Sequence, residues 1–101
     1  MNNKNIQIQL IEEPLVLSEC VNFVSSDGVG GIVNFVGTVR NQTKGKTVLR
    51  LDFEAYEPMA VSEMRKIAEK ALEKFDVQKI AIHHRIGFLK ISEVPVNISN
   101  A

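Results

Sequence analysis

Four basic residues lie close together near the middle of the sequence. Arg40 ends a nearly continuous apolar stretch, and Lys44, Lys46 and Arg50 follow with no acidic residue between them. Guanidinium and ammonium groups form charge-assisted hydrogen bonds with phosphate oxygens, so this cluster could hold a phosphate. Composition alone favours a solvated loop instead. Arg40 is the best placed of the four, because the end of a strand would hold its side chain in position.

Gly37 and two adjacent histidines are further candidates for a role in binding or catalysis. Gly37 interrupts a bulky stretch, where a bulge or the close approach of a ligand would need no Cβ atom. Alternation along a strand sends His83 and His84 to opposite faces, so they could not bind one metal ion together. His84 shares its face with three isoleucines and is expected to be a core histidine, while His83 and Arg85 are expected on the polar side. The sequence predicts no metal site, no cofactor and no Ser/His/Asp arrangement.

The composition is that of an ordinary folded protein. The 101 residues are 45% hydrophobic and 24% charged, and 12 basic residues balance 12 acidic ones. No overall field therefore draws the chain to nucleic acid or to an anionic membrane. The N-terminus has no signal-peptide pattern, which predicts a cytosolic protein, and the absence of repeats and linkers predicts a single domain over residues 1–101. The one cysteine, Cys20, is expected to be a small core residue rather than a reactive thiol.

The elements that must position these residues begin with a strand and a helix. Residues 6–11 alternate between apolar and polar, as in a half-buried strand. Apolar residues then recur at helical spacing from Leu17 to Val24, with Ser18 as the expected N-cap. Residues 31–39 are nearly all apolar and rich in β-branched side chains, which predicts a central strand covered on both faces.

The second half of the chain predicts more strands and one long helix. Residues 47–56 alternate strictly, which predicts a strand with one wet face, joined to the preceding strand as a hairpin through the polar segment 41–46. A helix is predicted from Pro58 to Phe75 by its i, i+3, i+4, i+7 apolar pattern. Two further strands are predicted at residues 80–86 and 94–98. The order β-α-β-β-α-β-β predicts an α+β fold with two helices and a mixed or largely antiparallel sheet.

Three segments, in this order and spacing, resemble the large, catalytic subunit of molybdopterin synthase, the MoaE family. They are residues 31–40 (GIVNFVGTVR), 51–60 (LDFEAYEPMA) and 82–87 (IHHRIG). The resemblance runs from about Gly30 to the C-terminus and implies the MoaE-like hammerhead fold. It also implies the family reaction, in which two sulfurs enter cyclic pyranopterin monophosphate to make the dithiolene of molybdopterin.

The resemblance implies partners and a binding segment as well. The sulfur arrives as a thiocarboxylate on the Gly-Gly C-terminus of a small ubiquitin-like subunit of the MoaD type. The large subunit forms the homodimeric centre of a heterotetramer. The family's substrate-contacting stretch falls on Thr38, Val39 and Arg40, which agrees with an anionic, phosphate-bearing ligand at Arg40.

The resemblance stops before the family's catalytic segment. Family members continue past the last strand into a His-Arg pair, a helix and a tail with two lysines that engage the thiocarboxylate and the pterin. The resemblance therefore places the catalytic lysines beyond Ala101 and assigns no catalytic residue within the sequence. Lys44 and Lys46 do not correspond to them, so the 101-residue chain alone is expected to be inactive. A shortened form of a true subunit is favoured over a shortened paralogue, which would have no need to keep residues 37–40.

Two other functions fit parts of the pattern. A non-catalytic scaffold that binds a ubiquitin-like partner would need the fold but not the sulfur transfer. An acyl-phosphate hydrolase of similar length and element order would use an arginine to hold phosphate. That family carries a Gly-rich cradle directly after the first strand, and here Glu12, Glu13 and Pro14 take its place, which argues against it.

Overall fold

The computed structural model describes residues 4–40, 42–43, 46–47, 50–53 and 57–101. These residues form two helices and eight strands. They are β1 (Ile6–Ile11), α1 (Leu17–Val24), β2 (Val33–Gly37), β3 (Gln42–Thr43), β4 (Lys46–Thr47), β5 (Arg50–Phe53), α2 (Glu57–Lys74), β6 (Ile80–Arg85), β7 (Gly87–Lys90) and β8 (Val96–Asn100). The predicted α+β fold with two helices is confirmed, with additional short strands at β3, β4 and β7.

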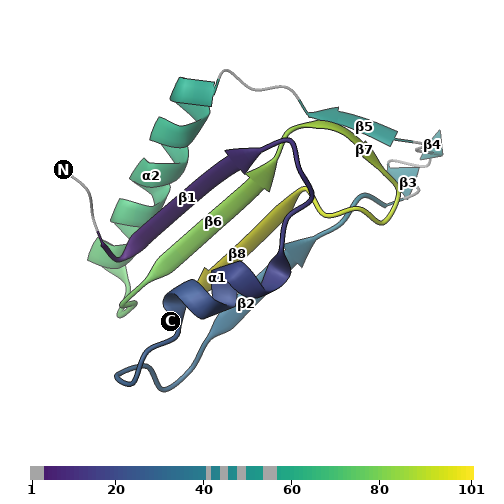
Figure 1. The fold of residues 1–101 in the computed structure, drawn as a ribbon. Helices are drawn as coiled ribbons and strands as arrows, with labels where there is room; N and C mark the ends of the chain where they lie inside the picture. Colours follow the sequence, from purple (N-terminus) through teal and green to yellow (C-terminus); the bar gives the residue numbers. More distant parts are fainter. Residues whose placement is uncertain (1–3, 41, 44–45, 48–49, 54–56) are drawn as a thin grey trace.

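The main sheet is mixed and has the strand order β1-β6-β8-β2 (Figure 1). β1 runs parallel to β6, whereas β8 is antiparallel to both β6 and β2. Two smaller pairings, β3 with β4 and β5 with β7, continue from one end of this sheet. The mixed sheet therefore agrees with the predicted fold class.

The prediction of a central strand at residues 31–39 is wrong. β2 pairs with β8 on one side only among the described residues, and the side chains of Val33 and Phe35 are 64% and 57% exposed. The predicted hairpin between this strand and residues 47–56 is also wrong, because β2 pairs with β8 and β5 pairs with β7. Only its tip forms, as β3 and β4. The predicted wet face of residues 47–56 concerns side chains outside the described part.

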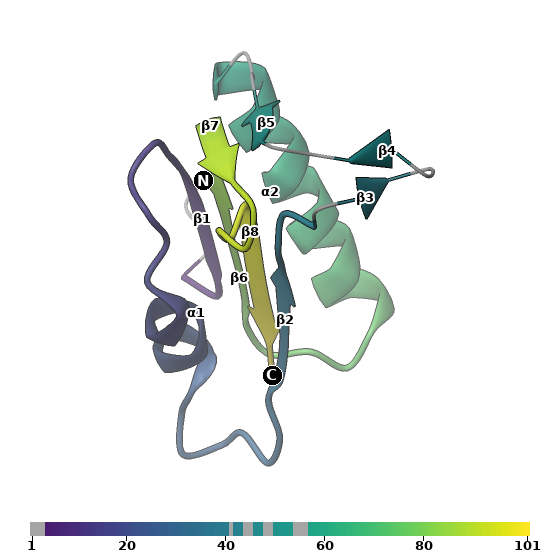
Figure 2. The same ribbon diagram turned by 90° about the vertical axis from the view of Figure 1, so that its right-hand side faces the viewer.

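The two helices lie on opposite faces of the main sheet (Figure 2). α2 packs against β1 and β6, where Ala68 joins Ile6, Ile80 and Ile82 in a buried apolar cluster. α1 packs against β6 and β8 on the other face. Each large aliphatic side chain removed from water in this way contributes roughly 1.5–3 kcal/mol, so the α2 face supplies much of the driving force for folding.

α1 begins two residues earlier than its predicted cap at Ser18 would require. Its N-cap is Val16, which has no capping side chain, and Ser18 lies inside the first turn, so the predicted cap at Ser18 is wrong. The helix is held by burial instead. Cys20 and Val24 are fully buried against Ala81 of β6. The prediction of Cys20 as a core residue is confirmed, and burial raises the pKa of its thiol to about 11, which keeps it protonated and unreactive near neutral pH.

Candidate functional site

The segment Thr38–Arg40 follows β2 directly and is held by its middle residue. Val39 is buried, while Thr38 and Arg40 are exposed on either side of it. Val39 N donates to Glu93 O (3.0 Å), and Ser92 N donates to Val39 O (2.8 Å). This pair of backbone hydrogen bonds fixes the chain one residue before Arg40. Arg40 therefore lies three residues beyond the end of β2 rather than at its last residue, so the prediction that a strand end holds it is wrong, and the anchoring hydrogen bonds belong to its neighbour Val39.

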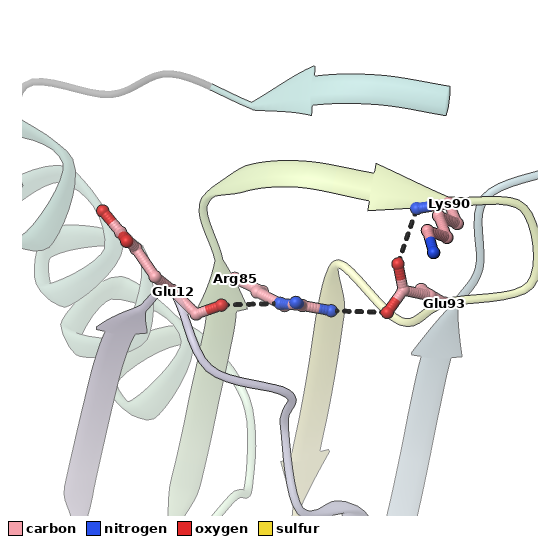
Figure 3. Close-up of polar contacts among 4 residues, drawn as sticks. All are labelled: Glu12, Arg85, Lys90 and Glu93. Atoms are coloured by element: carbon pink, nitrogen blue, oxygen red, sulfur yellow. Dashed lines mark hydrogen bonds and ion pairs between the residues drawn. The ribbon is translucent and has the colours of Figure 1, made fainter. Parts of the chain in front are cut away.

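The turn that anchors Val39 is itself tied down by charged groups. The Glu93 carboxylate accepts a hydrogen bond from Lys90 N (2.6 Å) and one from Arg85 Nη1 (3.0 Å) (Figure 3). Arg85 Nε also donates to Glu12 O (2.8 Å), at the end of β1. The Lys90 N–H and, after it, the Arg85 guanidinium hold the pKa of Glu93 below its ordinary value. The turn therefore keeps its ion pair with Arg85 at neutral pH.

Sequence reasoning missed the roles of Arg85 and Glu93. The sequence places Arg85 on the polar side of its strand but does not identify its partner, because Glu93 comes after a further strand and a turn. The signal available in the sequence was Glu93, an acidic residue eight positions after Arg85, which lies at the end of a predicted strand. Pairing across that distance depends on the path of β7, which the sequence pattern did not predict.

The predictions for Gly37 and for the four basic residues at Arg40, Lys44, Lys46 and Arg50 have different outcomes. A Cβ atom at Gly37 would lie 2.8 Å from Val96 Cγ1 and 3.4 Å from Phe35 Cε1. The close approach that this glycine permits in the structure is therefore that of a neighbouring side chain in the sheet. Of the four cations, Lys44 lies outside the described residues, and the side chains of Lys46 and Arg50 are not described. Their grouping around Arg40 stays a prediction.

The prediction for the two histidines is only partly confirmed by the structure. His83 is fully buried, and its Nε2 donates to Gln7 Oε1 (2.8 Å), whereas His84 is half-buried and its Nδ1 donates to Arg85 O (2.9 Å). The alternation along β6 was correct, but the face expected to be polar is covered by α1. The prediction that His83 faces the polar side is therefore wrong. His84 does bond to backbone, as predicted.

His83 belongs to a buried polar layer between α1 and the sheet. Asn97 Nδ2 donates to Asn34 Oδ1 (2.7 Å) and to Phe35 O (2.9 Å), and Ser99 Oγ donates to the same Asn34 oxygen (2.6 Å). Asn97 and Ser99 are fully buried. These side-chain bonds add to the β2–β8 ladder, so they fix the strand that leads to Thr38. Sequence reasoning followed the apolar alternation of the last strand and missed its polar face.

Acidification is expected to destabilise the protein through His83. Burial lowers the pKa of His83 below 6.5, with Glu19 of α1 opposing the shift. As the pH falls, the unfolded state binds a proton at His83 before the folded state does. The contribution of neutral His83 to stability is therefore complete above the pKa that His83 has in the unfolded state. It is lost as the pH falls from there through the pKa that His83 has in the folded state.

Urea unfolding at about pH 7.5 and about pH 5.5 measures this dependence, which cannot exceed about 1.4 kcal/mol per pH unit for one proton. His83→Gln is expected to flatten the pH dependence, and His84→Gln is the matched control that should keep it. An equal slope in His83→Gln and the wild type would assign the effect to other groups.

The described residues contain no group of three or more His, Cys, Asp or Glu side chains that could hold a metal ion. Among the same residues, neither helix has the length and apolar character needed to cross a membrane. The candidate site thus consists of the exposed Arg40 next to Val39, a buried residue whose N–H and carbonyl are both hydrogen-bonded.

Comparison with known proteins identifies the family. The family model described as MoaE protein matches residues 10–101. The chain belongs to the MoaE family. It is 42% identical over 95 residues to the molybdopterin synthase catalytic subunit of Dictyostelium discoideum, covering 92% of the chain and 60% of that relative. Against the human catalytic subunit it is 41% identical over 92 residues, covering 91% of the chain and 49% of the relative.

Solved structures agree with this assignment. The crystal structure of molybdopterin synthase from Staphylococcus aureus superposes with a TM-score of 0.85 at 32% identity, covering 99% of this chain and 71% of that one. A MoaE protein from Burkholderia ambifaria gives a TM-score of 0.83 at 26% identity, covering 94% of this chain and 63% of that one. This MoaE-family chain spans about 49–60% of the length of these two curated relatives.

Proposed function

We propose that this MoaE-family chain serves as the large subunit of molybdopterin synthase. In this role it would take part in transferring sulfur from a thiocarboxylated small subunit to cyclic pyranopterin monophosphate. The observation that carries the proposal is the match of residues 10–101 to the MoaE family model, together with 42% identity over 95 residues to a protein named molybdopterin synthase catalytic subunit. Residues 1–101 are proposed to form one MoaE-like domain of that subunit, and a cytosolic location stays a prediction.

The proposed substrate-binding residues are Thr38, Val39 and Arg40. Thr38 and Arg40 are exposed, and the buried Val39 between them is bonded to the 92–93 turn through both its N–H and its carbonyl. A rigid backbone lowers the entropy lost when a side chain engages a ligand. A guanidinium next to this anchored backbone suits the phosphate of a pterin monophosphate, because its fork can donate two parallel hydrogen bonds to phosphate oxygens.

The proposed protein partners are the ubiquitin-like small subunit and a second copy of the chain. Ile32, Val33 and Phe35 are 40–64% exposed at and next to β2, which supports a surface that contacts protein. Within the described residues, the free side of β2 is an unpaired strand edge as well. Sedimentation of the chain alone and with the small subunit tests both partnerships.

Turnover tests the proposed reaction. The chain is joined after Ala101 to the part of the Dictyostelium discoideum relative that follows its matched region. It is then incubated with thiocarboxylated small subunit and cyclic pyranopterin monophosphate, and the dithiolene product is measured. We expect product in proportion to the thiocarboxylate supplied, with unmodified small subunit as the control. Binding of the small subunit without any product would favour a non-catalytic scaffold.

A further inference from the structure

Arg85 joins three segments of the chain that are distant in sequence. Its Nε donates to Glu12 O after β1, its Nη1 donates to Glu93 Oε2 after β7, and its backbone N donates to Pro95 O before β8 (2.7 Å). The guanidinium lies between the first two acceptors (Figure 3). Its side chain is only 14% exposed, which separates it from an ordinary surface ion pair.

A short series of contacts leads from Arg85 to the candidate binding segment. Glu93 bonds to Arg85 through one carboxylate oxygen and to Lys90 N through the other. The backbone of the same residue accepts the Val39 N–H, and the adjacent Ser92 N–H donates back to Val39 O. One peptide bond then separates Val39 from Arg40.

The turn needs these external ties because its backbone is strained. Ser92 has a φ of 73°, a left-handed conformation in which a Cβ atom approaches the neighbouring carbonyl oxygen. Without its partners, this turn would relax toward other conformations. The bonds of Glu93 to Lys90 N and Arg85 hold the geometry in which Ser92 and Glu93 meet Val39.

We propose that Arg85 is a positioning residue for the anion site, fixing Val39 through Glu93 so that Arg40 is presented to the ligand. This inference rests on the proposed binding role of Thr38–Arg40. Arg85 uses two different nitrogens toward acceptors on different segments. A lysine has a single nitrogen at the end of a flexible stem and cannot reproduce this fork, so Arg85→Lys keeps the charge but loses the bridge.

Amide hydrogen exchange in the absence of ligand tests the positioning step. In Arg85→Lys we expect the Val39 amide to exchange about tenfold faster, because a local opening free energy lower by about 1.4 kcal/mol corresponds to that factor. The amide of Ile82, inside β6, is the internal reference. Lys66→Gln is the matched control, because it breaks the exposed Lys66–Glu63 pair on α2 (3.4 Å), away from this turn. An unchanged Val39 amide in both Arg85→Lys and Glu93→Gln would overturn the inference.

Binding of cyclic pyranopterin monophosphate, followed by calorimetry well below the melting temperature, tests the link to Arg40. We expect Arg85→Lys to weaken binding about tenfold in the wild-type background and to have little further effect in Arg40→Ala, as for coupled residues. Equal losses in both backgrounds, or full affinity in Arg85→Lys, would overturn the inference. If the wild-type chain does not bind this compound, the proposed function fails, and the exchange of Val39 still decides whether Arg85 positions the segment.

Discussion

Replacing Arg40 with alanine is expected to weaken binding of cyclic pyranopterin monophosphate by roughly 10- to 150-fold, the loss of one charge-assisted contact of about 1.5–3 kcal/mol. The Arg40 side chain is exposed and its neighbour Val39 is anchored, so its removal should leave the fold in place. Arg40→Lys should restore binding only in part, because an ammonium cannot donate a bidentate pair of hydrogen bonds. Calorimetric titration of each variant gives the affinities.

Arg65→Ala is the matched control for Arg40→Ala, because Arg65 lies on α2 and outside the candidate segment. Melting temperatures are recorded for the same samples. If Arg40 only stabilises the chain around it, alanine would lower the melting temperature slightly and leave the affinity unchanged. That result would remove Arg40 from the binding site.

Replacing Asn97 with alanine is expected to lower the free energy of unfolding by about 2–4 kcal/mol. Asn97 is fully buried and donates two hydrogen bonds to β2, to Asn34 Oδ1 and Phe35 O. Alanine removes both and leaves acceptors on β2 without these donors. A loss of this size corresponds to a melting temperature lower by about 10 °C or more in a domain of this length. Urea unfolding measures the change.

Asn100→Ala is the matched control, because Asn100 lies on the same strand, is half-buried and makes neither of these two hydrogen bonds. It should change stability by no more than about 0.5 kcal/mol, as is usual for substitutions outside such a network. Equal effects of the two substitutions would show that the buried layer does not hold β2. The position of Thr38 would then depend on the backbone ladder and the 92–93 turn alone.

Arg40→Ala and Asn97→Ala distinguish ligand binding at the site from structural support of the site. Asn97 acts within the main sheet, where it fixes β2 against β8. Arg85 and Glu93 act at the end of the sheet, where they hold the turn bonded to Val39. Arg40 is exposed and follows Val39 in the chain, next to both supports. Loss of affinity without loss of stability is therefore expected at Arg40, and loss of stability is expected first at Asn97.

Local pattern was enough to predict several elements of the fold. The helical spacing from Pro58 to Phe75 and the alternation at residues 6–11 and 80–86 correspond closely to α2, β1 and β6. These predictions succeeded because periodicities of about 3.6 and 2 residues reflect which side chains face the core within one element. The position of Arg40 after an apolar strand was visible for the same reason.

Position in the sheet was decided by tertiary structure alone. A nearly continuous apolar segment such as residues 31–39 has the same local pattern whether its strand is central or at an edge with uncovered apolar side chains. Among the described residues, β2 pairs with β8 alone, so this strand lies at the edge of the sheet. Local alternation likewise could not show that α1 covers the face of β6 that carries His83.

For the candidate site, too, some features follow from the sequence and others only from the tertiary structure. The sequence by itself predicted which residue could hold an anion, because residue type and place after a strand are local properties of Arg40. Only the tertiary structure showed the contacts around the segment that carries it: the Glu93 turn bonded to Val39, Arg85 bonded to Glu93, and Asn97 bonded to β2. These contacts join residues that are 8 to 63 positions apart. Such pairings are set by the path of the whole chain, since no periodicity within a single element records them.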